Sequence, residues 1–128
     1  DMLEQAKKRF NGHGHIRCVQ GDVGNLQMDD EAFDIVLSMN GFHAFPDKKK
    51  AFQEIWRVLK PGGAFIACFY IKGKSKRTDW LVKNILAKKG WFSPPFQNEE
   101  ELRDILRKMY KKIDLHIDGS MIYFHCVK

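Results

Sequence analysis

Hydrophobic positions along the chain follow helical spacing in some segments and form short continuous runs in others, so helices and strands are expected to alternate. Residues 1–10 carry apolar side chains three and four positions apart, which predicts a helix capped by Asp1. Residues 16–20 form a short β-type run that ends at Gly21. Residues 33–39 form a nearly continuous apolar run, which predicts a strand buried on both faces of a parallel sheet.

The next segments predict a strand–helix–strand crossover. A helix is expected over 47–59, because its apolar residues recur with the spacing of one helical face. Lys60-Pro61-Gly62-Gly63 stops this helix and reverses the chain, and residues 64–71 then form a second buried strand. Two strands joined in this way run parallel, with a right-handed connection.

The last part of the chain predicts two helices and a hairpin. Residues 78–89 have a broad apolar face, and Asn98 caps another helix. The aromatic segment 91–96 between them contains two adjacent prolines and is expected to be a loop. Residues 113–117 and 121–127 are separated by three residues, which permits only an antiparallel hairpin. The predicted fold class is α/β, with a mostly parallel sheet that ends in an antiparallel β-hairpin.

Composition is that of one globular domain, with 44% hydrophobic and 30% charged residues. We expect a cytoplasmic protein with no membrane partner, because no apolar run reaches the roughly 20 residues that span a bilayer. The three cysteines are far apart and lie in apolar stretches, so neither disulfides nor a metal site is expected. The net charge of +6 includes a dense basic stretch, 72–77, but no nucleic-acid-binding motif accompanies it, and solvated surface is the favoured interpretation.

Ligands of parallel sheets bind beyond the carboxyl ends of the strands, which selects three short segments: 21–23, 40–43 and 70–72. Asp22 is a short acid on a glycine turn, suited to accept a hydrogen bond from an exocyclic amine, while the next backbone N–H is a donor. Turns often contain Gly-Asp without any ligand, so this motif alone is a weak signal.

Three motifs in order give a more specific resemblance: Gly21-Asp22, the run from Phe33 to His43, and Glu54-Ile55-Trp56-Arg57-Val58-Leu59-Lys60-Pro61-Gly62-Gly63. Together they resemble the type 11 (UbiE-like) group of class I S-adenosylmethionine-dependent methyltransferases. The match begins at Asp1 and extends to about Ile71. It implies a Rossmann-like fold with S-adenosylmethionine as cofactor.

The resemblance also implies roles for particular residues. Asp22 would bind the adenine amino group and Val23 would approach the ring, while Met39 and Asn40 would lie by the methionyl end of the cofactor. Phe42 and Tyr70 are expected to bind the substrate. Tyr70 and the segment 91–96 either wall an acceptor pocket or pack to anchor a loop. Asp34, at the start of its strand, is expected to tie down the strand end by hydrogen bonds rather than to contact a ligand.

The family's glycine-rich loop and the ribose-binding acid after its second strand are not found in this sequence. We therefore expect that residues 1–128 are a single methyltransferase domain, N-terminally incomplete, with the first two strands missing. A longer polypeptide is expected, or a partner chain that fills the gap in the sheet; the oligomeric state is left open. The isolated segment is not expected to catalyse methyl transfer.

Three functions remain open. The first is methyl transfer to a small-molecule acceptor, with His43 either the catalytic base or a residue that hydrogen-bonds its loop. The second is a non-catalytic cofactor-binding or interaction domain of the same fold. The third is nucleic-acid methylation, for which only the basic stretch and the net charge argue.

Overall fold

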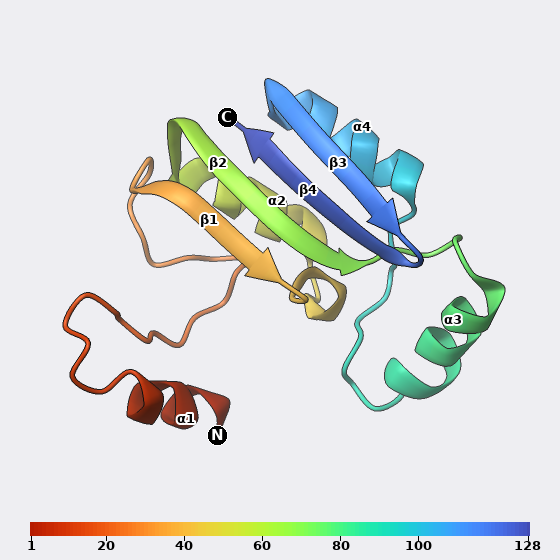
Figure 1. Cartoon of the computed structure of the whole chain (residues 1–128), viewed down its shortest axis with the longest axis horizontal. Helices are drawn as coiled ribbons and strands as arrows, with labels where there is room; N and C mark the ends of the chain where they lie inside the picture. Colours follow the sequence, from red (N-terminus) through yellow and green to blue (C-terminus); the bar gives the residue numbers. More distant parts are fainter.

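The computed structural model describes residues 1–128 and contains one mixed sheet of four strands (Figure 1). In chain order these are β1 (Phe33–Met39), β2 (Leu59–Tyr70), β3 (Lys112–Asp118) and β4 (Met121–Val127). Their order in the sheet is β1-β2-β4-β3, with β1 parallel to β2 and the other two pairs antiparallel. The predicted parallel crossover and terminal hairpin are both confirmed.

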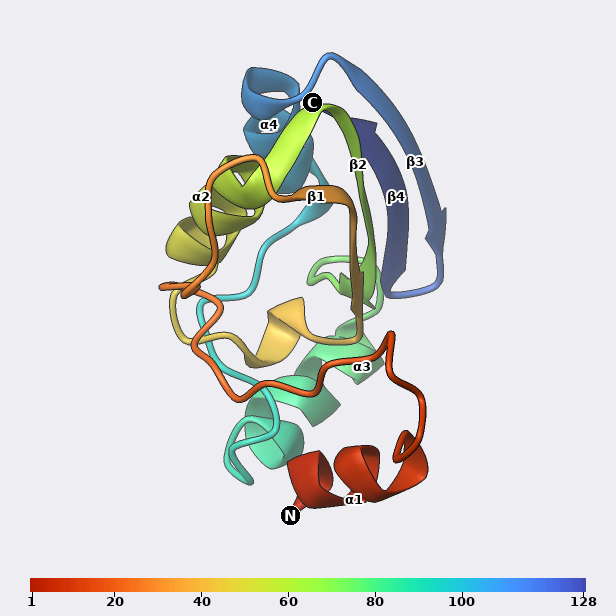
Figure 2. The ribbon, with the colours of Figure 1, turned by 90° about the vertical axis from the view of Figure 1, so that its left-hand side faces the viewer.

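Two of the helices cover one face of this sheet (Figure 2). These are α2 (Lys48–Val58) and α4 (Glu99–Met109). Asp47 caps α2 by accepting from the N–H of Lys50 at 3.0 Å. Asn98 begins α4 with a capping box. α4 therefore starts at its predicted cap, and α2 starts within one residue of its predicted range.

The core lies between the sheet and these two helices. Its centre is the aromatic side chain of Phe42, on the short 3₁₀ turn η1 (Phe42–Ala44). This ring packs within 6 Å of four other phenylalanine rings: Phe45, Phe52, Phe65 and Phe69. Burial of these large rings supplies much of the apolar area that stabilises the domain.

The opposite face of β1 is open. Ile35, Leu37 and Met39 are each about 60% exposed, and the strand is at the edge of the sheet. The prediction of a strand buried on both faces was therefore wrong for this chain. An apolar run indicates burial only where a second layer of structure covers the face, and none of the helices covers this one.

Residues 16–20 belong to no strand, so this part of the sequence prediction was also wrong. A β-strand requires a neighbour that accepts and donates its backbone hydrogen bonds, and no strand lies beside this run. The preceding helix α1 (Met2–Arg9) forms as predicted, with the Asp1 carboxylate accepting from the N–H of Leu3, but it buries none of its residues.

The helix predicted over 78–89 begins earlier and has two parts. α3 (Lys76–Leu81) is capped by the Ser75 hydroxyl, and a π-helical turn, Val82–Leu86, continues it. Val82 is the buried residue of this element. None of the helices in the chain is both long and apolar enough to cross a bilayer.

The Lys60–Gly63 turn ends α2 as predicted, but it belongs to β2 rather than to a loop. The register between β1 and β2 shifts here, so extra residues of β2 are accommodated beside one residue of β1. Gly63 is buried, and its carbonyl accepts from the N–H of the last residue, Lys128, while the Gly62 N–H donates to the Lys128 carbonyl. The Lys128 ammonium donates to the carbonyls of Trp56 and Leu59 and thereby caps the end of α2.

Gly63→Ala should destabilise the fold, because a Cβ at this position would lie 2.8 Å from the carbonyl oxygen of Lys60 and 3.0 Å from that of Asp34. Overpacking against backbone predicts a loss of about 1–3 kcal/mol in the free energy of unfolding, measured by urea titration. Gly14→Ala is the control, since no atom lies within 4 Å of its added methyl. Equal stability of the two variants would contradict this account of the turn.

Candidate functional site

The Asp22 turn is a compact loop at the surface. The Asp22 carboxylate accepts from the N–H of Gly24 at 2.8 Å, and its backbone carbonyl accepts from the N–H of Asn25 at 3.0 Å. Gly24 lies against Lys50, in the first turn of α2. Since α2 starts at the end of the sheet where β1 finishes, the Asp22 turn lies at the carboxyl edge of the parallel strands.

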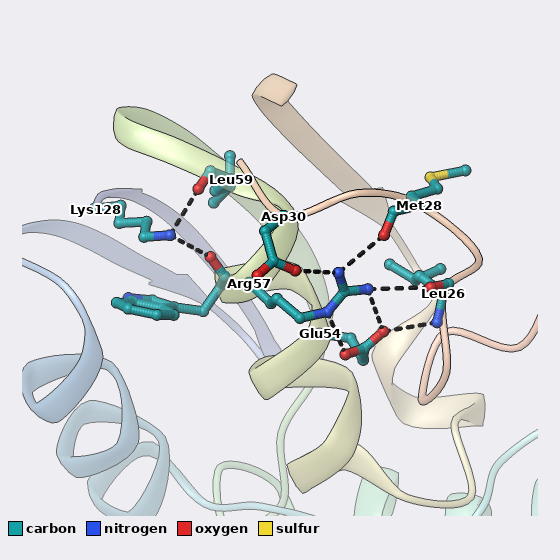
Figure 3. Close-up of polar contacts among 8 residues, drawn as sticks. Leu26, Met28, Asp30, Glu54, Arg57, Leu59 and Lys128 are labelled. Atoms are coloured by element: carbon teal, nitrogen blue, oxygen red, sulfur yellow. Dashed lines mark hydrogen bonds and ion pairs between the residues drawn. The ribbon is translucent and has the colours of Figure 1, made fainter. Parts of the chain in front are cut away.

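Arg57 and Glu54, on α2, hold this loop in place (Figure 3). The guanidinium donates to both carboxylate oxygens of Glu54, at 2.7 and 2.8 Å. It also donates to the carbonyls of Leu26 and Met28 and to the carboxylate of Asp30. Glu54 in turn accepts from the N–H of Leu26 at 2.7 Å. One ion pair on a helix thus satisfies the polar groups of a loop that has no strand partner.

This pair is the main polar connection of the loop. Every hydrogen bond between residues 22–31 and the rest of the chain ends on Glu54 or Arg57, including one from the N–H of Glu31 to the carbonyl of Arg57. Both residues belong to the motif from Glu54 to Gly63, from which no role was predicted for either side chain. Their spacing of three on a predicted helix was the signal that could have identified the pair.

The carboxyl end of β1 has an unusual backbone conformation at Asn40. Its φ of +54° lies in the left-handed region, which residues other than glycine seldom adopt. The N–H of Asn40 donates to the carbonyl of Cys68 on β2 at 2.8 Å, which fixes the turn. The preceding Met39 is exposed and lines a shallow groove of about 350 Å³ together with Cys68 and Tyr123.

Phe42 and His43 follow this turn but have different surroundings. Phe42 is completely buried at the centre of the core, so its ring has no surface on which a substrate could lie. This burial argues against the predicted substrate contact. His43 is half-buried and stacks on Phe92, with ring centroids 4.0 Å apart and planes at 14°.

One nitrogen of the His43 ring lacks a hydrogen bond. Its Nδ1 atom is buried and has no hydrogen-bond partner. Burial lowers the pKa of His43, and the positive charge of Lys48 lowers it further. Lys48, itself buried, donates to the carbonyls of Phe45 and Ser93. A neutral imidazole is the form that accepts a proton, so the environment favours the form a base requires.

Tyr70, at the end of β2, is tied to the next helix. Its hydroxyl donates to the Asp79 carboxylate at 2.6 Å, and burial together with this bond raises the pKa of Tyr70 above its ordinary value. The ring also contacts Phe92 and Phe96 edge to face. Of the two interpretations of the 91–96 segment, these contacts favour packing that anchors the loop.

Asp34 accepts from the ammonium of Lys60 at 3.0 Å and is largely exposed. This ion pair joins the start of β1 to β2, which is the strand-end role expected from the sequence.

Taken together, a parallel crossover with polar turns at its carboxyl edge defines an α/β protein of the Rossmann-like class. The model of the methyltransferase domain family matches residues 1–67, which is more than half of the chain. The chain therefore belongs to this methyltransferase family, of the type 11 group, and S-adenosylmethionine is the cofactor that this membership implies.

The chain matches only part of the length of each curated relative. The chain is 33% identical over 113 residues to the phthiotriol/phenolphthiotriol dimycocerosates methyltransferase of Mycobacterium leprae, covering 88% of this chain and 41% of that protein. It is 41% identical over 66 residues to the demethylmenaquinone methyltransferase of Staphylococcus epidermidis, covering 52% and 27% respectively. The chain thus spans less than half of these curated relatives.

Among solved structures, a SAM-dependent methyltransferase of Thermotoga maritima, described as a possible histamine N-methyltransferase, superposes with a TM-score of 0.79. The superposition covers 99% of this chain and 68% of that one, at 23% identity. At this identity the likeness shows the fold alone, and it confirms the Rossmann-like methyltransferase fold.

The residues present fit part of such a cofactor. The Asp22 carboxylate is exposed and uses one oxygen for the Gly24 N–H, which leaves the other oxygen as an acceptor for an amino group. The exposed thioether of Met39 is an apolar contact for the methionyl chain. No acid or glycine-rich loop for the ribose is found at this edge.

The Glu54–Arg57 pair should make stability depend on pH in acid. Hydrogen bonding from Arg57 holds the pKa of Glu54 at about 2, below the ordinary 4.5. Between these values the unfolded chain binds a proton that the folded chain does not, so stability falls as pH falls from about 4.5 through 2. Glu54→Gln should remove this part of the slope in urea titrations at several pH values.

Glu100→Gln, an exposed glutamate on α4 with no ion pair, is the control and should keep the wild-type slope. If Glu54→Gln and wild type lose stability in parallel over this range, Glu54 does not have the assigned role.

Proposed function

We propose that this chain is part of an S-adenosylmethionine-dependent methyltransferase that acts on a small-molecule acceptor. The observation that carries the proposal is the juxtaposition at one sheet edge of the Asp22 turn and the left-handed turn at Asn40. Strained residues of this kind concentrate at binding sites, where the surrounding structure holds them in place. The family match and relatives named for small-molecule acceptors support the same assignment.

In this proposal the two turns hold opposite ends of the cofactor. Asp22 accepts from the adenine amino group, and the backbone of Val23 lies against the ring. Met39 and Asn40 bind beside the methionyl end, where the Asn40 turn is fixed by its bond to Cys68. The rigid connection between α2 and the Asp22 loop keeps the two ends at a constant separation, which lowers the entropic cost of binding.

The bound cofactor would supply an activated methyl group on a sulfonium. The task of the protein is then to align the acceptor and to exclude water. For an acceptor that must lose a proton, His43 is the candidate base. Stacking on Phe92 fixes the orientation of its ring, and the lowered pKa keeps it neutral near pH 7. Tyr70 contributes by positioning, since its hydroxyl is engaged with Asp79.

We further propose that the domain is completed by strands that pair with the free edge of β1. The support is the edge itself: a parallel strand with unpaired backbone groups beside three exposed apolar side chains. These strands come from the same polypeptide or from a partner chain, and they would bring the ribose-binding residues. Residues 16–20, which belong to no strand in this chain, would also gain a strand partner.

Asp22→Asn tests the cofactor assignment. Replacing the carboxylate by an amide removes one charge-assisted hydrogen bond, so calorimetric titration of the full native polypeptide with S-adenosylmethionine should show roughly 10-fold to 100-fold weaker binding. Asp29→Asn is the matched control, because Asp29 is an exposed acid of the same loop with no hydrogen bond of its own.

Unchanged affinity in Asp22→Asn would refute the assigned contact. Titration of the 128-residue chain alone separates the remaining alternatives: binding that requires the completing strands supports an incomplete site, whereas no binding by the full polypeptide supports a non-catalytic domain.

A further inference from the structure

The net charge of the chain is concentrated in one segment, residues 72–91, which we term the cap segment. It contains seven of the 22 basic residues and one of the 16 acidic residues, so the rest of the chain holds fifteen of each sign. The basic members are Lys72, Lys74, Lys76, Arg77, Lys83, Lys88 and Lys89. The excess of +6 for the whole protein is therefore the excess of this segment alone.

Ion pairing does not account for these charges. Among the seven, only Lys74 forms an ion pair, with Glu99 of α4. The one acid, Asp79, accepts instead from the Tyr70 hydroxyl and the N–H of Gly73. Lys76 and Arg77 lie in the first turn of α3, where positive charge opposes the helix dipole and lowers stability slightly. Lys89 lies over the Trp91 ring, with its ammonium 5.0 Å from the ring centroid. The other five basic residues have no side-chain partner within the fold.

The same segment exposes large apolar side chains. Trp80 and Trp91, two of the three tryptophans, are 61% and 60% exposed, and Leu81 is 42% exposed. The third tryptophan, Trp56, is less exposed, at 40%, and has partners within the fold: its indole N–H donates to the Met109 carbonyl, and the Lys128 ammonium lies over its ring. Surface apolar groups interleaved with lysines indicate an interaction surface rather than a solvated one.

The cap segment projects from one end of the molecule. In Figure 1, β1 and β2 point toward the end where α3 lies, and Figure 2 shows α3 below the sheet at the same end. The bond from Tyr70 to Asp79 fixes α3 to the carboxyl end of β2. The exposed apolar residues therefore adjoin the edge of the sheet that carries the Asp22 and Asn40 turns.

We propose that the cap segment is a docking surface for an anionic lipid bilayer. Lysines attract the negatively charged headgroups, while Trp80, Leu81 and Trp91 enter the interfacial region, where tryptophan is favoured. A nucleic-acid surface is less well matched: six of the seven basic residues are lysines, and Leu81 has no counterpart on a phosphate backbone. Interfacial binding needs no spanning helix, so it is compatible with the absence of one.

Docking by this segment would place the sheet edge next to the membrane surface. An apolar acceptor dissolved in the bilayer would then reach the site without crossing water. This consequence rests on the proposed function, whereas the docking surface itself does not depend on methyl transfer.

Co-sedimentation of the chain with vesicles tests the proposal. Binding is expected to vesicles of phosphatidylcholine containing phosphatidylglycerol, and to be much weaker with phosphatidylcholine alone. Lys76→Gln/Arg77→Gln should lower the partition coefficient roughly 30-fold, because each basic group near an anionic surface contributes about a factor of five. Lys111→Gln/Lys112→Gln, with the same charge change at the start of β3, should lie within about twofold of wild type.

Tryptophan fluorescence supplies a second readout that surface electrostatics alone would not change. Brominated lipids should quench the emission of wild type. In Trp80→Phe/Trp91→Phe the remaining Trp56 should not be quenched, although the conservative replacements retain the fold.

Three results would overturn the proposal: no binding to anionic vesicles, an equal loss of binding in both lysine variants, or quenching that persists in Trp80→Phe/Trp91→Phe. Tighter binding to a single-stranded RNA or a DNA duplex than to vesicles, at equal phosphate concentration, would assign the surface to nucleic acid instead. Cofactor titration of the same samples is independent of these outcomes, so failure of docking and failure of methyl transfer are distinguishable.

Discussion

The guanidinium of Arg57 is the constraint on which the arrangement of the candidate site depends. Residues 22–31 have no strand partner, and a loop without one must satisfy its backbone groups elsewhere. Arg57 offers donors in a planar fork, and in this chain they reach two loop carbonyls and two carboxylates. Glu54 supplies the complementary acceptor for the Leu26 N–H. The Asp22 turn is therefore positioned from α2, which also determines where β1 and β2 lie.

Side-chain contacts between neighbouring elements also position the segments at the other end of this sheet edge. The Tyr70 hydroxyl joins β2 to α3 through Asp79, and stacking of His43 on Phe92 joins the loop after β1 to the segment after α3. Each turn near the site is thus held by contacts with a neighbouring element, as the Asn40 turn is by its backbone bond to Cys68 of β2. Arg57 and Glu54 project from a helix and Tyr70 from a strand, and these rigid elements position the loops of the site.

Much of the fold follows from local patterns in the sequence. The caps at Asp1 and Asn98, and the short connection of the terminal hairpin, determine structure within a few residues and were predicted correctly. The structure of residues 16–20 and the exposure of one face of β1 were not predicted correctly. Both depend on neighbouring elements, which the local pattern of hydrophobic residues does not reveal. Among site residues, the position of Asn40 follows from the end of β1, whereas that of Asp22 depends on the Glu54–Arg57 pair. The burial of Phe42 follows from packing among four other rings.

Hydrogen exchange at the Leu26 amide tests most directly whether Arg57 positions the Asp22 loop. In Arg57→Ala, Glu54 loses the cation that orients it, so the Leu26 amide should exchange at nearly the rate of an unprotected amide, while amides of β2 and β4 remain protected. Arg107→Ala, on the exposed side of α4, should leave Leu26 protected. Protection of Leu26 that survives the loss of Arg57 would contradict the account.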